Sequence, residues 1–431
     1  MPSKFGMKSR VEPITHIEDH AVAELIGQFR SPLFVISEKT IRETYRKAKN
    51  AFSTRYPKVQ FAWSYKTNYL DSVCRIFHQE GSWAEVVSGF EYDKALGNGV
   101  KGSQILFNGP DKADTDLKKA VENDSLIHID HFDEMYSIQA LSETLGKKPK
   151  VAIRVNMDTG VYPMWDRFGF NYENGDAWDA INRIMINEKL ELVGLHAHIG
   201  TYMMTANAYK IAAGKLADLA HGVEKKYGVH IKYIDVGGGF ASQNTLKGAY
   251  YPGIDTVPSI EEYAEAITSA LLNSPLDPRN LPMLILETGR ALIDDAGYLL
   301  GTVIANKRLS SGHRATIIDV GVNLMFTSFW YDHEVYPAAP VSDHLEETTL
   351  YGPLCMNIDV LREAIAFPLL KKGDQFVIKR IGAYNMTQWM QFITLRPNVV
   401  LIDMEEKVHI IRKEENMELI RQQEVIPDHL N

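Results

Sequence analysis

The sequence contains few cysteines. Only two of its 431 residues are cysteines, Cys74 and Cys355, and neither belongs to a CxxC pair or to a mixed cluster with histidine. Two cysteines cannot build a disulfide framework, and a structural zinc site needs a closely spaced set of Cys and His ligands. The composition therefore excludes a disulfide-stapled secreted domain and a zinc-finger module, and it indicates a reducing compartment.

Long apolar runs and an excess of positive charge are also missing. No stretch approaches the roughly 18 apolar residues of a membrane span, and the amino terminus lacks the apolar core of a signal peptide. Lys and Arg number 46 against 55 Asp and Glu, a net charge of −9, and they form no basic block. We therefore expect a cytoplasmic protein that acts on small molecules, with neither nucleic acid nor a membrane as its partner.

Apolar and β-branched residues form eight short runs, which alternate with longer stretches of helical period such as residues 207–228. The runs are 59–65, 84–87, 105–108, 126–130, 151–155, 192–198, 231–236 and 283–287. This alternation is typical of parallel strands joined by helices. Eight such units predict an α/β protein built on a closed (β/α)8 TIM barrel, with an open doubly wound sheet as the alternative.

The pattern changes after residue 290. Short strand-like runs at 302–305, 315–320, 375–381 and 399–402 are separated by Gly, Pro and Asp turns. The early apolar run at 33–36 is expected to pair with them. We therefore predict a cofactor-binding barrel over residues 38–290. A C-terminal β-sandwich or β-barrel domain is predicted from residues 291–431, completed by an N-terminal strand from residues 1–37.

Unusual polar residues follow the predicted strands, at the end of the barrel where active sites lie. Lys66 directly follows the first strand in "FAWSYKTN", and His196 and His198 end the sixth. In an extended strand both imidazoles would project to the same side. Two histidines without an evident third ligand are weak evidence for zinc, so no metal site is predicted, whereas a flat ring can stack on a planar cofactor. For Lys66, a solvated surface charge is the alternative.

Features that suit an anion follow the last two strands. Gly237, Gly238 and Gly239 let the backbone approach a phosphate closely, although a tight turn also needs glycine. Glu287 and Arg290 in "ETGR" can serve a protonated ring nitrogen and a phosphate, or form a structural ion pair. A lysine, a stacking imidazole, a glycine cradle and a carboxylate together predict a site for pyridoxal 5′-phosphate (PLP), held by lysine as a Schiff base.

Nine ordered motifs between residues 32 and 402 carry a resemblance to a known family. They are "YKTN" at Lys66, "AEVVSGFE" from Ala84, "NGPDK" from Asn108, "RFGF" from Arg167, "HAHIGT" from His196, "DVGGGF" from Asp235, "ETGR" from Glu287, "GPLC" from Gly352 and "GAYN" from Gly382. The chain resembles the fold type III, alanine-racemase-like PLP enzymes. Within them it is similar to the diaminopimelate/ornithine/arginine decarboxylase group.

The resemblance implies a role for each matching residue. Lys66 would form the imine with PLP, His198 would stack on its ring, and Glu287 would pair with its pyridine nitrogen. Residues expected to hold the phosphate are Thr201, Gly237, Gly238, Gly239, Arg290 and Tyr384, with Glu85 and Arg154 in supporting positions. The group forms homodimers in which the "GPLC" segment crosses into the partner's site, so Cys355 would act in trans.

The resemblance also implies the reaction. Loss of CO2 from a substrate linked to PLP leaves a quinonoid carbanion delocalised into the protonated ring, and Cys355 would return the proton. The alternative for Cys355 is a small buried hydrophobic residue, which is how we interpret Cys74.

Departures from the family pattern concern the substrate. Members acting on diaminopimelate have an arginine after the "DVGVN"-like segment and a glutamate after the cysteine, where this chain has Thr327 and Met356. The acidic residue that ornithine decarboxylases carry directly after the cysteine is also missing. "GPLCMNID", with Asp359 four residues past Cys355, is similar to decarboxylases of siderophore and antibiotic pathways, which take modified or carrier-linked amino acids. Cys355 and Asp359 are therefore expected to contact substrate.

We predict a PLP-dependent amino-acid α-decarboxylase with a non-standard substrate, either free or conjugated or linked to a carrier. Diaminopimelate decarboxylation to lysine is the alternative. An amino-acid racemase would need two opposed acid/base groups, and the "GPLC" segment argues against it. An inactive decarboxylase homologue that regulates a partner would be expected to lose Lys66 or the cofactor contacts, which are present.

Overall fold

The computed structural model describes residues 11–341 and 344–430, and it divides into two compact units. The barrel unit comprises Ile41–Ser242 and Asp255–Ile293. The β unit comprises Gln243–Ile254 and the described parts of Met1–Thr40 and Asp294–Asn431. The prediction had placed residues 243–254 in the barrel, whereas they group with the β unit. The domain division at residues 38 and 290 otherwise stays a prediction.

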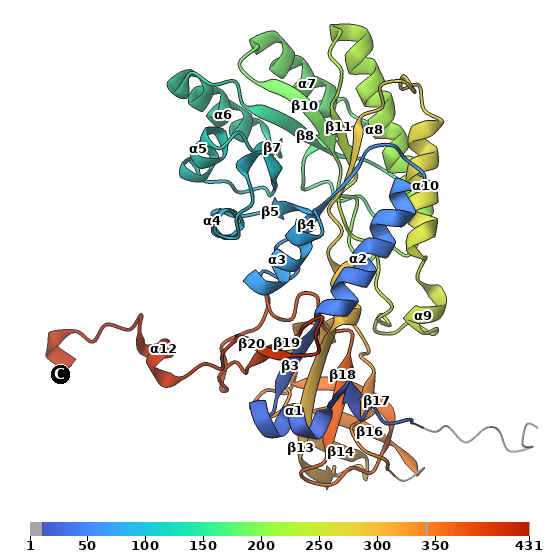
Figure 1. The fold of residues 1–431 in the computed structure, drawn as a ribbon, viewed down its shortest axis with the longest axis vertical. Helices are drawn as coiled ribbons and strands as arrows, with labels where there is room; N and C mark the ends of the chain where they lie inside the picture. Colours follow the sequence, from blue (N-terminus) through green and yellow to red (C-terminus); the bar gives the residue numbers. More distant parts are fainter. Residues whose placement is uncertain (1–10, 342–343, 431) are drawn as a thin grey trace, which may run out of the picture. The chain divides into compact units, whose positions relative to one another are not determined.

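Eight parallel strands form the closed barrel (Figure 1). They are β4 (Val59–Ser64), β5 (Trp83–Val86), β6 (Ile105–Phe107), β7 (Leu126–Ile129), β8 (Lys150–Asn156), β10 (Glu191–His196), β11 (Tyr233–Asp235) and β12 (Met283–Leu286). β12 pairs with β4, and β8 pairs with β10, which closes the ring. The predicted (β/α)8 barrel is confirmed. The open doubly wound sheet is wrong because an open sheet has two unpaired edges.

Helices surround these strands (Figure 1). They are α2 (Glu38–Ser53), α3 (Asp71–Gln79), α4 (Gly89–Gly97), α5 (Asp114–Glu122), α6 (Phe132–Leu145), α7 (Asp176–Asn187), α8 (Ala206–Tyr227) and α10 (Ile260–Leu272). The predicted helix at 207–228 is α8. The Thr205 hydroxyl caps its first turn, and Gly228 ends it at φ 66°, a left-handed conformation that glycine adopts without strain.

Small and apolar side chains fill one level of the barrel interior. Ala62, Leu106, Leu126, Ala152, Val193, Tyr233 and Ile285 form one buried cluster, drawn from seven of the strands. Because side chains alternate across a strand, the residue two positions further along each strand also faces inward. This apolar level therefore lies directly beneath the side chains that stand two positions further along each strand, at the mouth of the barrel.

The β unit contains a sheet in which the early strand β3 (Leu33–Ser37) is central. The sheet order is β17-β16-β14-β13-β3-β19-β20; β18 pairs with β13, and β15 pairs with β18. The strands are β13 (Gly297–Arg308), β14 (Arg314–Ile318), β15 (Val335–Pro337), β16 (Leu345–Tyr351), β17 (Val360–Pro368), β18 (Gln375–Lys379), β19 (Val399–Ile402) and β20 (Val408–Arg412). β3 lies antiparallel to β13 and parallel to β19, which confirms that an N-terminal strand completes this domain.

In the β unit, the strands β15, β16, β17 and β20 and the two-residue strands β1 (His16–Ile17) and β2 (His20–Ala21) were not predicted. β16 reads LEETTLY and β17 reads VLREAIAFP, and four of the seven positions in β16 and six of the nine in β17 are exposed or only partly buried. Their polar residues hide the apolar signal that marked the barrel strands. Other short elements complete the described chain: α1 (Val22–Phe29), β9 (Phe170–Asn171), α9 (Gly253–Thr256), α11 (Arg290–Ile293) and α12 (Met417–Arg421). Across the described residues, none of the helices has the length and apolar character to span a bilayer.

Candidate active site

A level of polar side chains lies at the carboxyl ends of the barrel strands. Asn108, His128, Arg154, Asp235 and Glu287 each stand two positions after a member of the apolar interior cluster. All five are buried. Buried polar groups are costly unless they are hydrogen-bonded, so a whole level of them at the mouth of the barrel marks this end as the candidate site.

A chain of contacts joins the predicted Schiff-base lysine to the predicted ring-nitrogen carboxylate. The Nζ of Lys66 donates to Glu85 Oε2 at 2.6 Å. The Nδ2 of Asn108 donates to Glu85 Oε1 at 3.0 Å and to Glu287 Oε1 at 2.6 Å. The predicted residues Lys66, Glu85 and Glu287 are therefore brought together, and Asn108, to which the sequence assigned no role, connects them.

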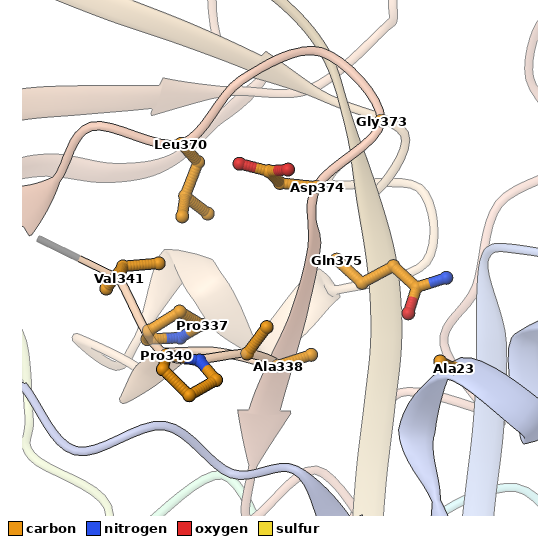
Figure 2. A pocket seen from close by; sticks show the side chains of 10 residues that line it. Ala23, Pro337, Ala338, Pro340, Val341, Leu370, Gly373, Asp374 and Gln375 are labelled. Atoms are coloured by element: carbon orange, nitrogen blue, oxygen red, sulfur yellow. The ribbon is translucent and has the colours of Figure 1, made fainter.

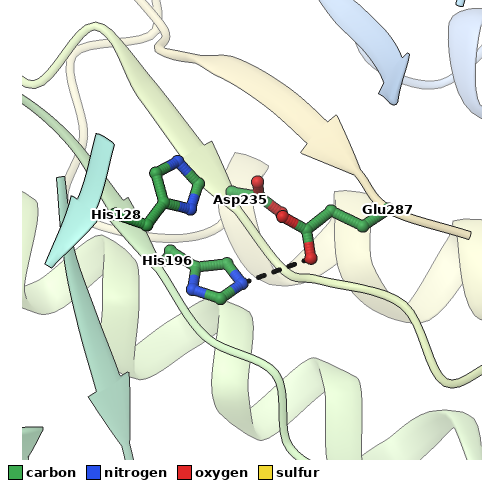
Figure 3. A group of neighbouring side chains, drawn as sticks. All are labelled: His128, His196, Asp235 and Glu287. Atoms are coloured by element: carbon green, nitrogen blue, oxygen red, sulfur yellow. Dashed lines mark hydrogen bonds and ion pairs between the residues drawn. The ribbon is translucent and has the colours of Figure 1, made fainter. Parts of the chain in front are cut away.

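Glu287 also lies against two histidines and a second carboxyl group. Figure 3 shows this group, which comes from β7, β10, β11 and the position directly after β12, with His196 Nε2 and Glu287 Oε2 joined at 3.3 Å. His128 Nε2 contacts the Tyr233 hydroxyl at 2.9 Å. Burial lowers the pKa of His128 and of His196 well below the usual range, so both imidazoles are held neutral.

Asp235 faces Glu287 from the neighbouring strand (Figure 3). Burial, and after it the negative charge of Glu287, raise the pKa of Asp235 well above its usual value. Asp235 Oδ1 accepts a hydrogen bond from the Gly237 N–H at 2.8 Å. The environment thus favours the protonated form of Asp235.

The same four residues have the spacing of a metal site. Ligand atoms of His128, His196, Asp235 and Glu287 lie within 4.8 Å of one another. All four residues already have hydrogen-bond partners: the Tyr233 hydroxyl contacts His128 Nε2, His196 contacts Glu287 Oε2, and the Gly237 N–H donates to Asp235 Oδ1. The predicted absence of a metal site stays a prediction.

The glycine triplet lies where three loops of the barrel meet. A Cβ on Gly237 would stand 2.7 Å from the Ala197 carbonyl oxygen, and one on Gly238 would stand 2.5 Å from that of Glu287. Gly239, at φ 92°, would place a Cβ 2.1 Å from the Gly200 carbonyl oxygen. Larger residues are excluded here, so the loops after β10, β11 and β12 pack backbone to backbone.

The loops after β4 and β12 are equally close. A Cβ on Gly289 would stand 2.0 Å from Thr67 Oγ1, which puts the "YKTN" segment directly against "ETGR". The buried hydroxyls of Thr67 and Thr288 have no hydrogen-bond partner in the described part of the chain. Two buried hydroxyls beside the glycine loops are suitable donors for an oxyanion.

His198 lies beyond the end of β10, because the strand ends at His196. His196 and His198 therefore do not lie in one continuous strand, as the sequence pattern had predicted. His198 stacks on Trp165, with ring centroids 5.6 Å apart and planes 20° apart. Burial, followed by the cations Arg154 and Lys66, lowers the pKa of His198 to about 3. The ring is consequently neutral and flat, which suits stacking.

The remaining predicted residues of the barrel lie around this site. Arg154 pairs with Asp130 at 3.4 Å and lies 4.4 Å from the Phe168 ring centroid. Arg290 is buried and lies 5.6 Å from the ring centroid of Tyr202. Thr201 is exposed in the loop after β10. Their predicted contacts with a cofactor stay predictions.

Cys355, Asp359 and Tyr384 belong to the β unit. Cys355 is exposed. Asp359 is buried, and its two carboxylate oxygens accept hydrogen bonds from the Val322 N–H at 2.8 Å and the Leu354 N–H at 2.7 Å. This geometry gives Asp359 a role in shaping the Cys355 segment, and its contact with substrate stays a prediction. Tyr384 is half-buried with a φ of 65°.

A separate pocket on the β unit lacks comparable chemistry (Figure 2). It is lined by Ala23, Pro337, Ala338, Ala339, Pro340, Val341, Leu370, Gly373, Asp374 and Gln375. Asp374 is the one titratable residue in this lining, and its carboxylate accepts a hydrogen bond from the Lys371 N–H at 2.7 Å. The barrel mouth is therefore the better candidate for catalysis.

Comparison with known proteins identifies the family. The sequence model described as "Pyridoxal-dependent decarboxylase, pyridoxal binding domain" matches residues 38–294. The chain belongs to this family. A diaminopimelate decarboxylase from Methanothermobacter thermautotrophicus is 30% identical over 400 residues, which cover 90% of each chain. The diaminopimelate decarboxylase from Bacillus subtilis is 27% identical over 398 residues, which cover 89% of each chain.

Solved structures agree with this assignment. The crystal structure of diaminopimelate decarboxylase from M. jannaschii superposes with a TM-score of 0.89 at 27% identity, covering 98% of this chain and 99% of that one. A structure of the same enzyme in complex with L-lysine gives a TM-score of 0.88 at 26% identity, with the same coverage. The protein is thus a PLP-dependent amino-acid decarboxylase, as predicted.

The site described above fits PLP. Lys66 supplies an amine, Glu287 a carboxylate and His198 a neutral planar ring. His198 Nδ1 is buried without a hydrogen-bond partner among the described residues, and so are the Thr67 and Thr288 hydroxyls beside the glycine loops. A decarboxylase of this family needs an amine, an anion for the ring nitrogen and donors for the phosphate, and this level of the barrel offers all three.

The sequence analysis missed three residues of this site: Asn108, His128 and Asp235. Each lies in or directly after a predicted strand, and each is polar within an apolar run. That interruption was the available signal, because a polar residue that faces the interior of a barrel must find a partner there.

Proposed function

We propose that the protein removes the α-carboxyl group of a non-standard amino acid, free or conjugated, rather than of diaminopimelate. The supporting observation is the state of Thr327, at the place where family members acting on diaminopimelate carry an arginine. Thr327 is buried, and its hydroxyl contacts His333 Nε2 at 2.8 Å and donates to Asn385 Oδ1 at 2.8 Å. Threonine carries no positive charge to bind a distal carboxylate, and its hydroxyl is already hydrogen-bonded within the protein.

Met356 supports the same proposal. It stands where family members acting on diaminopimelate carry a glutamate after the cysteine, and its thioether offers no charge to a distal ammonium group. A site that lacks both the arginine and the glutamate leaves the distal carboxylate and the distal ammonium group of diaminopimelate without charged partners. The energetic cost of leaving such groups unpaired is what lets a polar site discriminate strongly between substrates.

The barrel residues have separate tasks in this proposal. Bound PLP supplies the electron sink that allows the α-carboxyl group to leave as CO2. Lys66 attaches the cofactor through Nζ, and Glu85 Oε2, 2.6 Å away, is placed to hold a proton that the amine releases. Glu287 presents its charge to the ring nitrogen, and the donors Asn108 and His196 fix its orientation.

Stacking and phosphate binding complete the cofactor site. His198 stays neutral at any pH well above 3, so its ring can lie on the cofactor without adding positive charge. We assign phosphate binding to the glycine triplet, Thr201, Arg290 and Tyr384, and a supporting position to Arg154. These assignments follow the family pattern and are tested by measuring PLP affinity in single variants.

Cys355 is proposed to deliver a proton from Sγ to the α-carbon after CO2 has left. In the homodimer that we propose, this cysteine serves the partner's barrel. The test is complementation between two variants that are each impaired on their own: Lys66→Ala and Cys355→Ala proteins are mixed, dissociated and reassociated. Shared sites predict recovery to about a quarter of wild-type activity, because half of the dimers are mixed and each has one intact site. No recovery in mixed dimers would contradict a shared site.

Diaminopimelate decarboxylation is the second candidate. The relatives described above are named diaminopimelate decarboxylases, and one similar structure holds L-lysine. Release of CO2 from purified holoenzyme decides between the two, using meso-diaminopimelate, L- and D-lysine, ornithine, arginine, and citryl and glutamyl conjugates. We expect a conjugate or modified amino acid to give the highest kcat/KM. Efficient turnover of meso-diaminopimelate above all others would contradict the proposal.

A further inference from the structure

The side-chain amide of Asn108 bridges two carboxylates at the centre of the barrel mouth. An amide nitrogen has two N–H groups. In Asn108 one points to Glu85 Oε1 at 3.0 Å and the other to Glu287 Oε1 at 2.6 Å. Both hydrogens of this single nitrogen are therefore used, and each goes to a different acidic residue.

The orientation of this amide is set by its neighbours. A rotation of the amide plane by half a turn would direct the carbonyl oxygen of Asn108 at both carboxylates, where three acceptors would face one another without a proton. In the observed orientation Oδ1 is buried and accepts no hydrogen bond from any described residue. An unsatisfied buried acceptor is unfavourable, so this arrangement is not what stability alone would select.

The backbone beneath Asn108 is held rigidly. Its N–H donates to the Val86 carbonyl oxygen at 2.8 Å. Gly109 follows at φ 101°, and a Cβ there would stand 2.9 Å from the Val87 carbonyl oxygen. The Gly109 carbonyl oxygen accepts from Lys112 Nζ at 2.7 Å. Asn108 thus projects from a fixed segment and cannot follow the carboxylates if they move.

Lys112 extends this anchor to the next strand. Its ammonium group is buried and also donates to the His128 carbonyl oxygen at 2.9 Å and to Glu134 Oε1 at 2.6 Å. Glu134 Oε2 in turn accepts from the Asp130 N–H at 2.8 Å. All three ammonium hydrogens are used, so the loop carrying Asn108 is tied to the end of β7 and to α6.

We propose that Asn108 is a positioning residue that holds Glu85 and Glu287 at a fixed separation, and so holds the two ends of PLP at once. Glu85 contacts the lysine that attaches the cofactor, and Glu287 is assigned to its ring nitrogen. Without the bridge, two buried negative charges would repel each other and rotate apart. This inference rests on the proposed roles of Lys66 and Glu287 and does not depend on the identity of the substrate.

The test compares full-length Asn108→Ala, Asn108→Gln and Asn108→Asp proteins with wild type. Asn123→Ala is the matched control, because Asn123 is exposed and its amide donates to the Lys119 carbonyl oxygen. PLP affinity is measured by titration of the visible absorbance. We expect Asn108→Ala and Asn108→Gln to weaken PLP binding about tenfold or more, and the control to bind as wild type does.

The pH midpoint of the visible band separates positioning from general destabilisation. Asn108→Asp adds a negative charge next to Glu85, the carboxylate that contacts Lys66, which should raise the midpoint by about one pH unit. PLP affinity within twofold of wild type in all three variants would overturn the inference. Weaker PLP binding with an unchanged midpoint in Asn108→Asp would also overturn it. If the three variants are too unstable to purify, the smaller substitution Asn108→Ser is tested instead, and normal PLP binding by a folded Asn108→Ser protein would overturn the inference. Absence of PLP binding by the wild type would instead refute the cofactor roles themselves.

Discussion

The barrel unit and the β unit hold their predicted functional residues in opposite ways. In the barrel, Lys66, Glu85, Asn108 and Glu287 form a connected network with three buried members. In the β unit, Cys355 is exposed. The difference indicates that the barrel preorganises the groups assigned to the imine and the ring nitrogen of the cofactor, whereas the β unit leaves Cys355 in an exposed segment.

Two buried polar side chains of the β unit, Asp359 and Thr327, make the same point. Both oxygens of Asp359 are taken by backbone N–H groups, and the Thr327 hydroxyl is taken by His333 and Asn385. These groups shape the β unit and leave no free charge for a ligand. In the barrel, by contrast, the polar groups converge on a common space at the strand ends, as the topology requires.

Lys66→Ala should have the largest effect. It removes the amine that attaches PLP, so we expect loss of the visible band after dialysis and a fall in kcat of about a thousandfold or more. Absorbance and CO2 release measure the two effects. Lys118→Ala, on the exposed face of α5, is the control and should behave as wild type. An unchanged visible band in the dialysed Lys66→Ala protein would show that Lys66 does not attach PLP.

Glu287→Gln keeps the size of the side chain but removes its charge. Because the charge supports a protonated ring, kcat should fall by about a hundredfold to a thousandfold while PLP stays bound. Steady-state kinetics with the preferred substrate measure the effect, and Glu265→Gln is the exposed control. A kcat within threefold of wild type would show that this network does not tune the cofactor.

Glu91→Gln tests whether the buried carboxyl group of Glu91 lowers the free energy of unfolding of the protein. Burial raises the pKa of Glu91 from 4.5 to about 7, with the Glu85 charge as a smaller cause. The Glu91 carboxyl loses its proton at a lower pH in the unfolded chain than in the folded protein. The free energy of unfolding should therefore fall as the pH rises from 4.5 to 7. Glutamine has no such loss, and the variant should become more stable than wild type by about 3 kcal/mol at pH 7.

Urea unfolding of wild type and Glu91→Gln at several pH values measures this difference, with exposed Glu122→Gln as the control. The stabilisation should disappear near pH 4.5, because both side chains are then neutral. A difference that does not depend on pH would mean that the carboxyl of Glu91 is charged in the folded barrel as well.

Cys355→Ala should have the smallest effect of this series and should separate the two units most clearly. Loss of a proton donor is expected to slow kcat by about tenfold to a hundredfold, or to misplace the proton on the product, while the visible band is unchanged. Product analysis after reaction in D2O measures proton delivery. Unchanged turnover with normal deuterium incorporation would show that another group protonates the product.

The barrel could be predicted closely from the sequence, because its strands are buried on both faces and read as continuous apolar runs. β4, β7, β8 and β12 lie within a residue of their predicted ends. β16 and β17 were missed because charged residues interrupt their apolar runs, among them the exposed Glu347 and Glu363. A strand that is polar on one face needs its partner strand to be known before its period can be recognised.

The site divides in the same manner. Lys66, Glu287 and the glycine triplet were predictable because each stands in a loop directly beside a strand end, within a recognisable motif. Asn108 and Asp235 stand in motifs as well, yet their partners lie on other strands of the barrel. Contacts of this kind exist only after the ring of strands closes, so local spacing cannot predict them.

The central claim is that Lys66 carries PLP within the polar level of the barrel. Borohydride reduction of the purified holoenzyme, followed by proteolysis and mass spectrometry, tests it directly. We predict a single pyridoxyl-modified peptide containing Lys66, and none from the Lys66→Ala protein. Modification of another lysine, or of no lysine in a protein that retains the visible band, would contradict the account.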